Sequence, residues 1–362
     1  MYGGTKAYFI SLIYLLSNNG YKITVVLKKN QLDEEILRLQ QNCPFEVITL
    51  EFDIWRTQFK KPIFTRLNKT YLIYQARELL YFWKILQKTK ASLLICSIGN
   101  PEELIFLFLS PVRMLYAIHT ATMDRMDKFK RFILNARLSK KRRIITVSNF
   151  AKKHVLLNWT NGHHSNDIMA VHNYYHLLRD NKKVDKNNPL TILTIGTVGF
   201  YKNPILWIDI CKEVEKRFPD PIQFIWAGDG AMLDECLELT KDHPQIRFIG
   251  YESNVEKWYE CSYIYIQPSI TESHGIALLG AMAHKIPSII SNVGGMVESI
   301  DDGKSGFIIP EENKTLYADK VLELLCNPVL HDNMGEEAFQ KYNKYFTRNS
   351  WTTNMNSLLE TN

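Results

Sequence analysis

The segment 271–283, TESHGIALLGAMA, places an acid, a glycine turn and a short apolar helix in direct succession. We expect the helix to begin at Ile276, directly after Gly275. The first N–H groups of a helix have no partner within it and lie at its positive end, so the amides of Gly275, Ile276 and Ala277 can bind an anion such as phosphate. Glu272 stands at the mouth of this predicted site, where an acid has little structural reason to be.

Two further segments carry residues that suit a diphosphate. In SNVGGMVE, Gly294 and Gly295 precede a second predicted helix, which carries Glu298. In IGTVGFYKN, Lys202 follows the end of a predicted strand, where an ammonium group could neutralise charge on a leaving phosphate. The alternative is that the glycines merely cap their helices and that Lys202 is an ordinary loop lysine.

The elements that must position these residues are short β-branched runs alternating with helical stretches, which is the pattern of parallel sheets. The predicted strands before the polar stretch 177–189 are 23–27, 45–52, 92–97, 114–120, 143–149 and 168–173. Those after it are 190–196, 222–228, 246–251, 262–268, 287–292 and 306–310. We therefore predict an α/β fold of two doubly wound, Rossmann-like domains, residues 1–183 and 184–345, with a terminal helix in 346–362. Ligands of such folds bind beyond the carboxyl ends of the strands, here in the cleft between the domains.

The first domain lacks the buried strand with which a doubly wound domain normally opens. Met1 and Tyr2 lead directly into Gly3-Gly4 and an apolar helix over residues 7–16. We expect either an empty or rearranged central position in the first sheet, or a true start upstream. The apolar run could pass for the hydrophobic part of a signal peptide, but SNNG follows it in place of a small-residue cleavage pattern.

The length of 362 residues suggests two or three domains, and 46% apolar with 23% charged residues is ordinary for a soluble globular protein. Glu102 and Glu103 interrupt the longest apolar run, so no segment is expected to span a membrane. The six cysteines show no CxxC spacing, which favours reduced thiols in a cytoplasmic protein and argues against a zinc site or a disulfide framework. We predict no metal site.

Charge is distributed unevenly along the chain. Residues 1–180 hold 27 Lys and Arg against 13 Asp and Glu, whereas the remainder holds 17 against 25. The basic excess is concentrated in 127–143, DKFKRFILNARLSKKRR. This segment is either a solvated helix face with its apolar stripe in the core, or a surface, Lys128–Arg143, that approaches anionic phospholipid or a phosphate-rich acceptor. No motif supports binding to nucleic acid.

The motifs GFYKN, WAGDGAML, IRFIGY and TESHGIALLGAMAHKIPSIISNVGGMVE, in this order and spacing, resemble the carboxyl-terminal domain of the retaining glycosyltransferases of family 4. The amino-terminal half resembles the same family more weakly, through GGTKAYFISLIYLLSNNGYKITVV, AIHT, ITVSNFAKKHVL and VHNYYH. The resemblance implies the GT-B fold of two facing domains, with the last helix crossing back to the first. It also implies transfer of a sugar from a nucleotide diphosphate sugar, with retention and commonly without a metal.

The resemblance assigns roles to individual residues. Glu272 corresponds to the acid that contacts the hydroxyls of the donor sugar, and the amides after Gly275 to those that contact the diphosphate. Lys202 corresponds to the lysine on the phosphates. His119 corresponds to the histidine that faces the donor sugar, and Gly4 lies in the loop that closes over the reaction centre.

Two positions depart from the family pattern and leave alternatives open. Gly280 stands where the family typically has a glutamate for the nucleotide ribose, and Thr197 where it often has an arginine for the phosphates. We expect a transferase in polysaccharide or glycolipid assembly, acting on a lipid-linked or glycan acceptor at the inner face of the cell membrane. The main alternative is a catalytically silent protein that binds a glycan or a partner glycosyltransferase. A GT-B epimerase or phosphorylase is the third interpretation.

Overall fold

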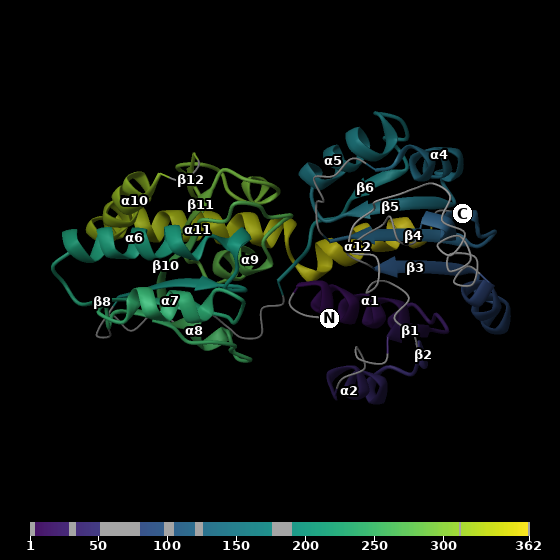
Figure 1. Ribbon diagram of the computed structural model, residues 1–362, viewed down its shortest axis with the longest axis horizontal. Coiled ribbons are helices and arrows are strands. Elements are labelled where there is room, and N and C mark those ends of the chain that lie inside the picture. Colours follow the sequence, from purple (N-terminus) through teal and green to yellow (C-terminus); the bar gives the residue numbers. More distant parts are fainter. Residues whose placement is uncertain are drawn as a thin grey trace. The chain divides into compact units, whose positions relative to one another are not determined.

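The computed structural model describes residues 4–28, 34–50, 80–97, 105–119, 126–175, 190–310 and 313–360. Contacts divide the chain into two compact units, which Figure 1 shows as ribbons. Unit 1 comprises Met1–Ile145 and His154–Met169, and unit 2 comprises Thr146–Lys153 and Ala170–Thr361. The predicted domain limits at 183 and 345, and the return of the last helix to the first domain, stay predictions.

Unit 2 is built on a six-stranded sheet whose strand order is β12-β11-β10-β7-β8-β9, and its pairings are parallel. Its strands are β7 (Leu190–Ile195), β8 (Ile222–Ala227), β9 (Ile246–Phe248), β10 (Ser262–Gln267), β11 (Ser288–Ser291) and β12 (Gly306–Ile309). The order reverses between the central strands β7 and β10, and in such sheets ligands bind beyond the carboxyl ends of the strands at this point. Lys202 follows β7 and Glu272 follows β10, so the topology brings the two loops together.

Helices cover both faces of this sheet because successive strand residues point to opposite sides. Ile192 and Phe224 pack into the cluster that includes α6 (Pro204–Arg217) and α10 (Lys314–Cys326). Their neighbours Leu193 and Ile225 pack into the cluster that includes α9 (Ile276–Ala283) and α11 (Pro328–Tyr345). The other helices of the unit are α7 (Leu233–Thr240), α8 (Glu256–Glu260) and α12 (Arg348–Glu360).

Unit 1 contains two sheets in its described part. A parallel pair joins β1 (Thr24–Lys28) to β2 (Glu46–Leu50), and a four-stranded sheet has the order β3-β4-β5-β6. The latter strands are β3 (Leu93–Ser97), β4 (Arg113–Ile118), β5 (Arg142–Thr146) and β6 (Ile168–Ala170). Its helices include α1 (Gly4–Asn18), α2 (Glu34–Asn42), the 3-10 helix η3 (Ile105–Leu109), α4 (Lys128–Arg137) and α5 (Asn149–Thr160), and residues 80–89 are also helical. Helix α5 begins in the segment grouped with unit 2.

The twelve predicted strands are confirmed, most of them with earlier carboxyl ends. Among the described residues, the pair β1-β2 and the four-stranded sheet are separate sheets. Four of the six cysteines are buried as free thiols. None of the helices in the described ranges has the length and apolarity needed to cross a bilayer.

Candidate functional site

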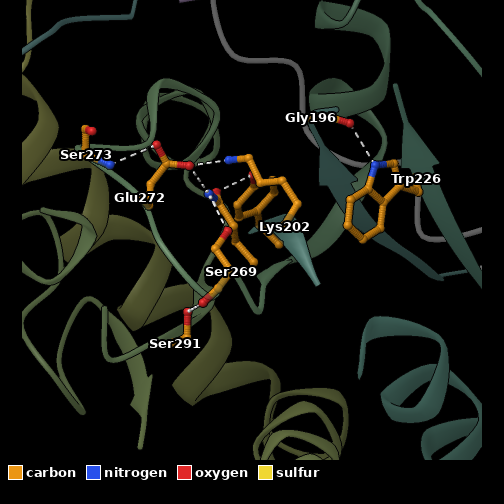
Figure 2. Close-up of polar contacts among 9 residues, drawn as sticks. Gly196, Lys202, Trp226, Ser269, Glu272, Ser273 and Ser291 are labelled. Atoms are coloured by element: carbon orange, nitrogen blue, oxygen red, sulfur yellow. Dashed lines mark hydrogen bonds and ion pairs between the residues drawn. The ribbon is translucent and has the colours of Figure 1, made fainter. Parts of the chain in front are cut away.

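Lys202 and Glu272 meet at the carboxyl end of the unit 2 sheet (Figure 2). Lys202 ends the 3-10 helix η4 (Phe200–Lys202), and its ammonium group pairs with Glu272 Oε2. The two loops are also joined through their backbones, because Ile270 N donates to Tyr201 O at 2.9 Å. Both side chains are largely but not fully buried, with 13% and 17% exposure, so the pair remains accessible to a polar ligand.

The Lys202 loop is held by glycines that allow close packing. The side chain of Lys202 lies over Gly196, where an added Cβ would be 3.4 Å from Lys202 Cε. The carbonyl of Gly196 accepts a hydrogen bond of 2.8 Å from Trp226 Nε1 (Figure 2). A Cβ at Gly228 would lie 1.9 Å from the same carbonyl oxygen, so only glycine allows the two strand ends to approach this closely.

Gly294 and Gly295 lie against the backbone of Glu272 and support it. Gly295 N donates to Glu272 O at 3.0 Å, and a Cβ at Gly294 would lie 1.7 Å from that oxygen. The helix after them, η5 (Met296–Glu298), is a single 3-10 turn. The second predicted helix is therefore a 3-10 turn, and a role of this segment toward a diphosphate stays a prediction. The glycines are needed because another backbone lies against them.

Helix α9 begins at Ile276 after Gly275, as predicted. Gly275 has φ 86°, a left-handed conformation that favours glycine, and no side chain caps the helix start. The amides of the first turn, including those of Ile276 and Ala277, have no intrahelical acceptor. They leave a donor array directly after the Glu272 loop, which suits an anion.

A buried polar chain behind Glu272 was missed by the sequence analysis. Gln267 Nε2 donates to Glu272 Oε2 at 3.1 Å, and Tyr265 donates its hydroxyl to Gln267 Oε1 at 2.8 Å. Glu272 Oε1 accepts from Ser273 N at 3.2 Å. Gln267 is 1% exposed, so this network orients the carboxylate from within the core. The available signal was a glutamine that ends the otherwise apolar strand SYIYIQ.

Glu298 has partners different from the ligand that we expected. Its carboxylate accepts hydrogen bonds from Asn149 N at 2.9 Å, Phe150 N at 2.6 Å and His172 Nε2 at 2.8 Å, all within unit 2. Burial alone would raise the pKa of Glu298, but the hydrogen bonds from His172 and the two amides outweigh it and lower the pKa to about 2. This arrangement makes Glu298 a cap for the start of α5, and its role toward a nucleotide sugar stays a prediction.

Gly280 is a packing glycine. It is buried in α9, and an added Cβ would lie 2.5 Å from both Cζ and the hydroxyl of Tyr259. Tyr259 is held in place, because its hydroxyl donates to Ala277 O at 2.8 Å and its ring stacks on His284 at 5.0 Å between centroids. A glutamate at position 280 would therefore clash with Tyr259 unless that ring moved. Thr197 is exposed beside the site and brings no charge.

The predicted site residues of unit 1 lie near one another. His119 Nε2 is 2.8 Å from Ser97 Oγ, and its ring meets the edge of Tyr8 at 4.5 Å between centroids. Tyr8 lies one turn after Gly4, the first residue of α1. Burial lowers the pKa of His119 to about 4, so the imidazole is neutral near pH 7. The role of His119 and Gly4 toward a donor sugar stays a prediction.

Comparisons with known proteins match part of the chain to one family. Residues 178–341 match the family described as Glycosyl transferases group 1. The N-acetyl-alpha-D-glucosaminyl L-malate synthase of Bacillus anthracis is 33% identical over 127 residues, which are 34% of this chain and 33% of that protein. The poly(ribitol-phosphate) alpha-N-acetylglucosaminyltransferase of Staphylococcus aureus is 27% identical over 42% of this chain and 32% of that protein. The alignments thus span about a third of these curated relatives.

Solved structures match over nearly the whole chain. A glycosyltransferase from Rickettsia africae has a TM-score of 0.76 at 16% identity, over 99% of this chain and 95% of that one. Anabaena HepE in complex with UDP and glucose has a TM-score of 0.73 at 15% identity, over 99% of this chain and 96% of that one. At such identities the likeness shows the fold, which is GT-B. Residues 178–341, which include Lys202 and Glu272, match the group 1 glycosyltransferases.

Proposed function

We propose that the protein transfers a sugar from a nucleotide diphosphate sugar to an acceptor hydroxyl, with retention of anomeric configuration. The observation that carries the proposal is the meeting of Lys202 and Glu272 in front of the uncapped start of α9. This arrangement offers a cation and backbone donors for phosphate oxygens, and a carboxylate for sugar hydroxyls. The Staphylococcus aureus relative is an N-acetylglucosaminyltransferase by name, the Rickettsia africae structure is a glycosyltransferase by name, and HepE was solved with UDP and glucose.

In this mechanism the amides of Ile276 and Ala277 bind the diphosphate, and Lys202 stabilises the negative charge that develops on it as the sugar leaves. Without ligand, the ammonium group is neutralised by Glu272. A bound diphosphate competes for Lys202, and the carboxylate then accepts hydrogen bonds from the donor sugar. Gln267 keeps Glu272 oriented during this exchange, because its amide is itself held by Tyr265.

The direct test is a screen of nucleotide sugars for thermal stabilisation and hydrolysis, followed by calorimetric titration of variants. Lys202→Ala should weaken nucleotide diphosphate binding by about tenfold to a hundredfold, because a charge-assisted hydrogen bond contributes about 1.5–3 kcal/mol. Glu272→Ala should reduce transfer at least tenfold with folding intact. Lys216→Ala, an exposed lysine of α6, is the matched control. Normal turnover by a folded Glu272→Ala variant would refute the assignment.

The proposed acceptor is a glycan or a lipid-linked saccharide, in polysaccharide or glycolipid assembly at the cytoplasmic face of the cell membrane. The excess of positive charge in residues 1–180 supports an anionic or membrane-held acceptor. Incubating the enzyme and its labelled donor with membranes or with soluble oligosaccharides separates the two classes. Label that appears only on small soluble alcohols would contradict this acceptor class.

The second candidate is a silent protein of the same fold that binds a glycan or a partner transferase. It is favoured by two observations beside the site: Thr197 supplies no charge for phosphate, and Gly280 has no room for an acid toward ribose. Calorimetry distinguishes the two. Failure of all uridine and guanosine diphosphate sugars to bind the natural protein would favour the silent protein.

A further inference from the structure

Helix α4 carries two phenylalanines whose side chains are exposed and do not pack in the core. The buried side of the helix is made by Ile133 and Leu134. Phe129 and Phe132 are 60% and 70% exposed. With the exposed Ala136 they are spaced three or four residues apart, so they share one helix face. Exposed aromatic side chains grouped in this way mark a surface that contacts another apolar phase.

Basic residues flank these rings along the chain. Residues 126–145 contain eight Lys and Arg and a single acid, Asp127. Asp127 is used locally, since its side chain accepts from the amides of Phe129 and Lys130 at the start of α4. Lys128 at one end of the helix and Lys140 and Lys141 just after the other are exposed.

Not all cations of the segment are available for a partner. Arg143 is buried, and the guanidinium group of Arg142 donates to Ser110 O at 2.5 Å. Arg137 Nε donates to Phe108 O at 3.1 Å. These three arginines hold the fold of unit 1. We therefore define the basic aromatic face as Lys128, Phe129, Phe132, Lys140 and Lys141.

We propose that the basic aromatic face docks on an anionic phospholipid surface, with both phenylalanine rings in the interfacial region and the lysines against the headgroups. Two observations support this one partner. The lysines give charge complementarity to an acidic membrane, and the rings provide the apolar contact that interfacial helices bury at the headgroup boundary. Binding of nucleic acid through phosphates would need the lysines but not the shared aromatic face. The proposal does not depend on the proposed transfer reaction, because its readout is binding to vesicles.

The test is sedimentation of the full chain with phosphatidylcholine vesicles that contain or lack phosphatidylglycerol. We expect binding to the acidic vesicles alone, and weakening as salt shortens the Debye length from about 10 Å at 0.1 M to about 3 Å at 1 M. Replacing Lys128, Lys140 and Lys141 by glutamine should weaken binding about a hundredfold, or about fivefold per lysine. Phe129→Ser with Phe132→Ser should weaken it at least tenfold.

Matched controls come from unit 2. They are the exposed lysines Lys216, Lys314 and Lys344 replaced by glutamine, and the exposed apolar residues Leu237 and Val329 replaced by serine. The controls should bind like the natural protein. Circular dichroism checks that each variant is folded. If the double phenylalanine variant does not fold, Phe132→Ser alone is used in the vesicle assay. Equal binding to neutral and acidic vesicles, equal losses in the controls, or tight binding to nucleic acid without vesicle binding would overturn the proposal.

Discussion

Replacing Gly280 by alanine should destabilise unit 2, although alanine is the better helix former. The new methyl group would lie 2.5 Å from Tyr259 Cζ, about 1 Å closer than an ordinary carbon contact. Moving the buried ring costs about 1–3 kcal/mol as overpacking, and losing its hydrogen bond to Ala277 O costs about 1 kcal/mol more. The gain in helix propensity is about 1 kcal/mol. We expect a net loss of about 2 kcal/mol, which lowers Tm by about 4–8 °C.

The assay is urea unfolding followed by circular dichroism, in a double-mutant cycle with Tyr259→Leu. If the methyl group and the ring conflict, Gly280→Ala should cost less in the Tyr259→Leu background, with a coupling energy of about 0.5–3 kcal/mol. A stable Gly280→Ala protein, or additive effects in the cycle, would refute the reasoning. So would a folded Gly280→Glu variant that binds a nucleotide diphosphate more tightly than the natural protein.

Three further changes test other parts of unit 2. Glu298→Gln should lower stability by about 1–3 kcal/mol at pH 7. The folded pKa of Glu298, about 2, lies below the unfolded value, so the stability difference between the two proteins should vanish as the pH falls from about 4.5 toward 2. A series of unfolding curves at different pH values measures this. His274→Phe should raise stability, because both ring nitrogens lack a hydrogen-bond partner in the described structure and burial lowers the pKa of His274 to about 3. The folded pKa of His274 lies below the unfolded value of about 6.5, so the natural protein loses stability as the pH falls below about 6.5. The difference in unfolding free energy between the variant and the natural protein should therefore grow by about 2 kcal/mol at pH 5. A difference that does not change with pH would contradict this. Gln267→Leu should reduce transfer at least fivefold through Glu272, and it should lower stability by about 1–3 kcal/mol because the buried hydroxyl of Tyr265 loses its acceptor; unchanged transfer by the folded variant would show that the carboxylate needs no support.

The sequence by itself determined the strands and the main site loops. Strand positions follow from local runs of β-branched residues, and the doubly wound order follows from their alternation with helices. The start of α9 was readable because Gly275 and the apolar run after it are adjacent in the chain. Lys202 and Glu272 could be assigned to one site before the structure because parallel strands end at one edge of a sheet, whereas their ion pair was not predicted.

Only the tertiary structure decided what the side chains contact. Gly280 faces Tyr259, which comes from a different helix, and Glu298 faces amides from a segment that is distant in sequence. In the segment 127–143 the periodic pattern mixed two sets of apolar residues, and packing alone separates buried Ile133 from exposed Phe132. The same physical reason applies to Gly280, to Glu298 and to the segment 127–143. Spacing along the chain gives the direction of a side chain within its own element, whereas its neighbours are set by elements that pack against it from elsewhere in the fold.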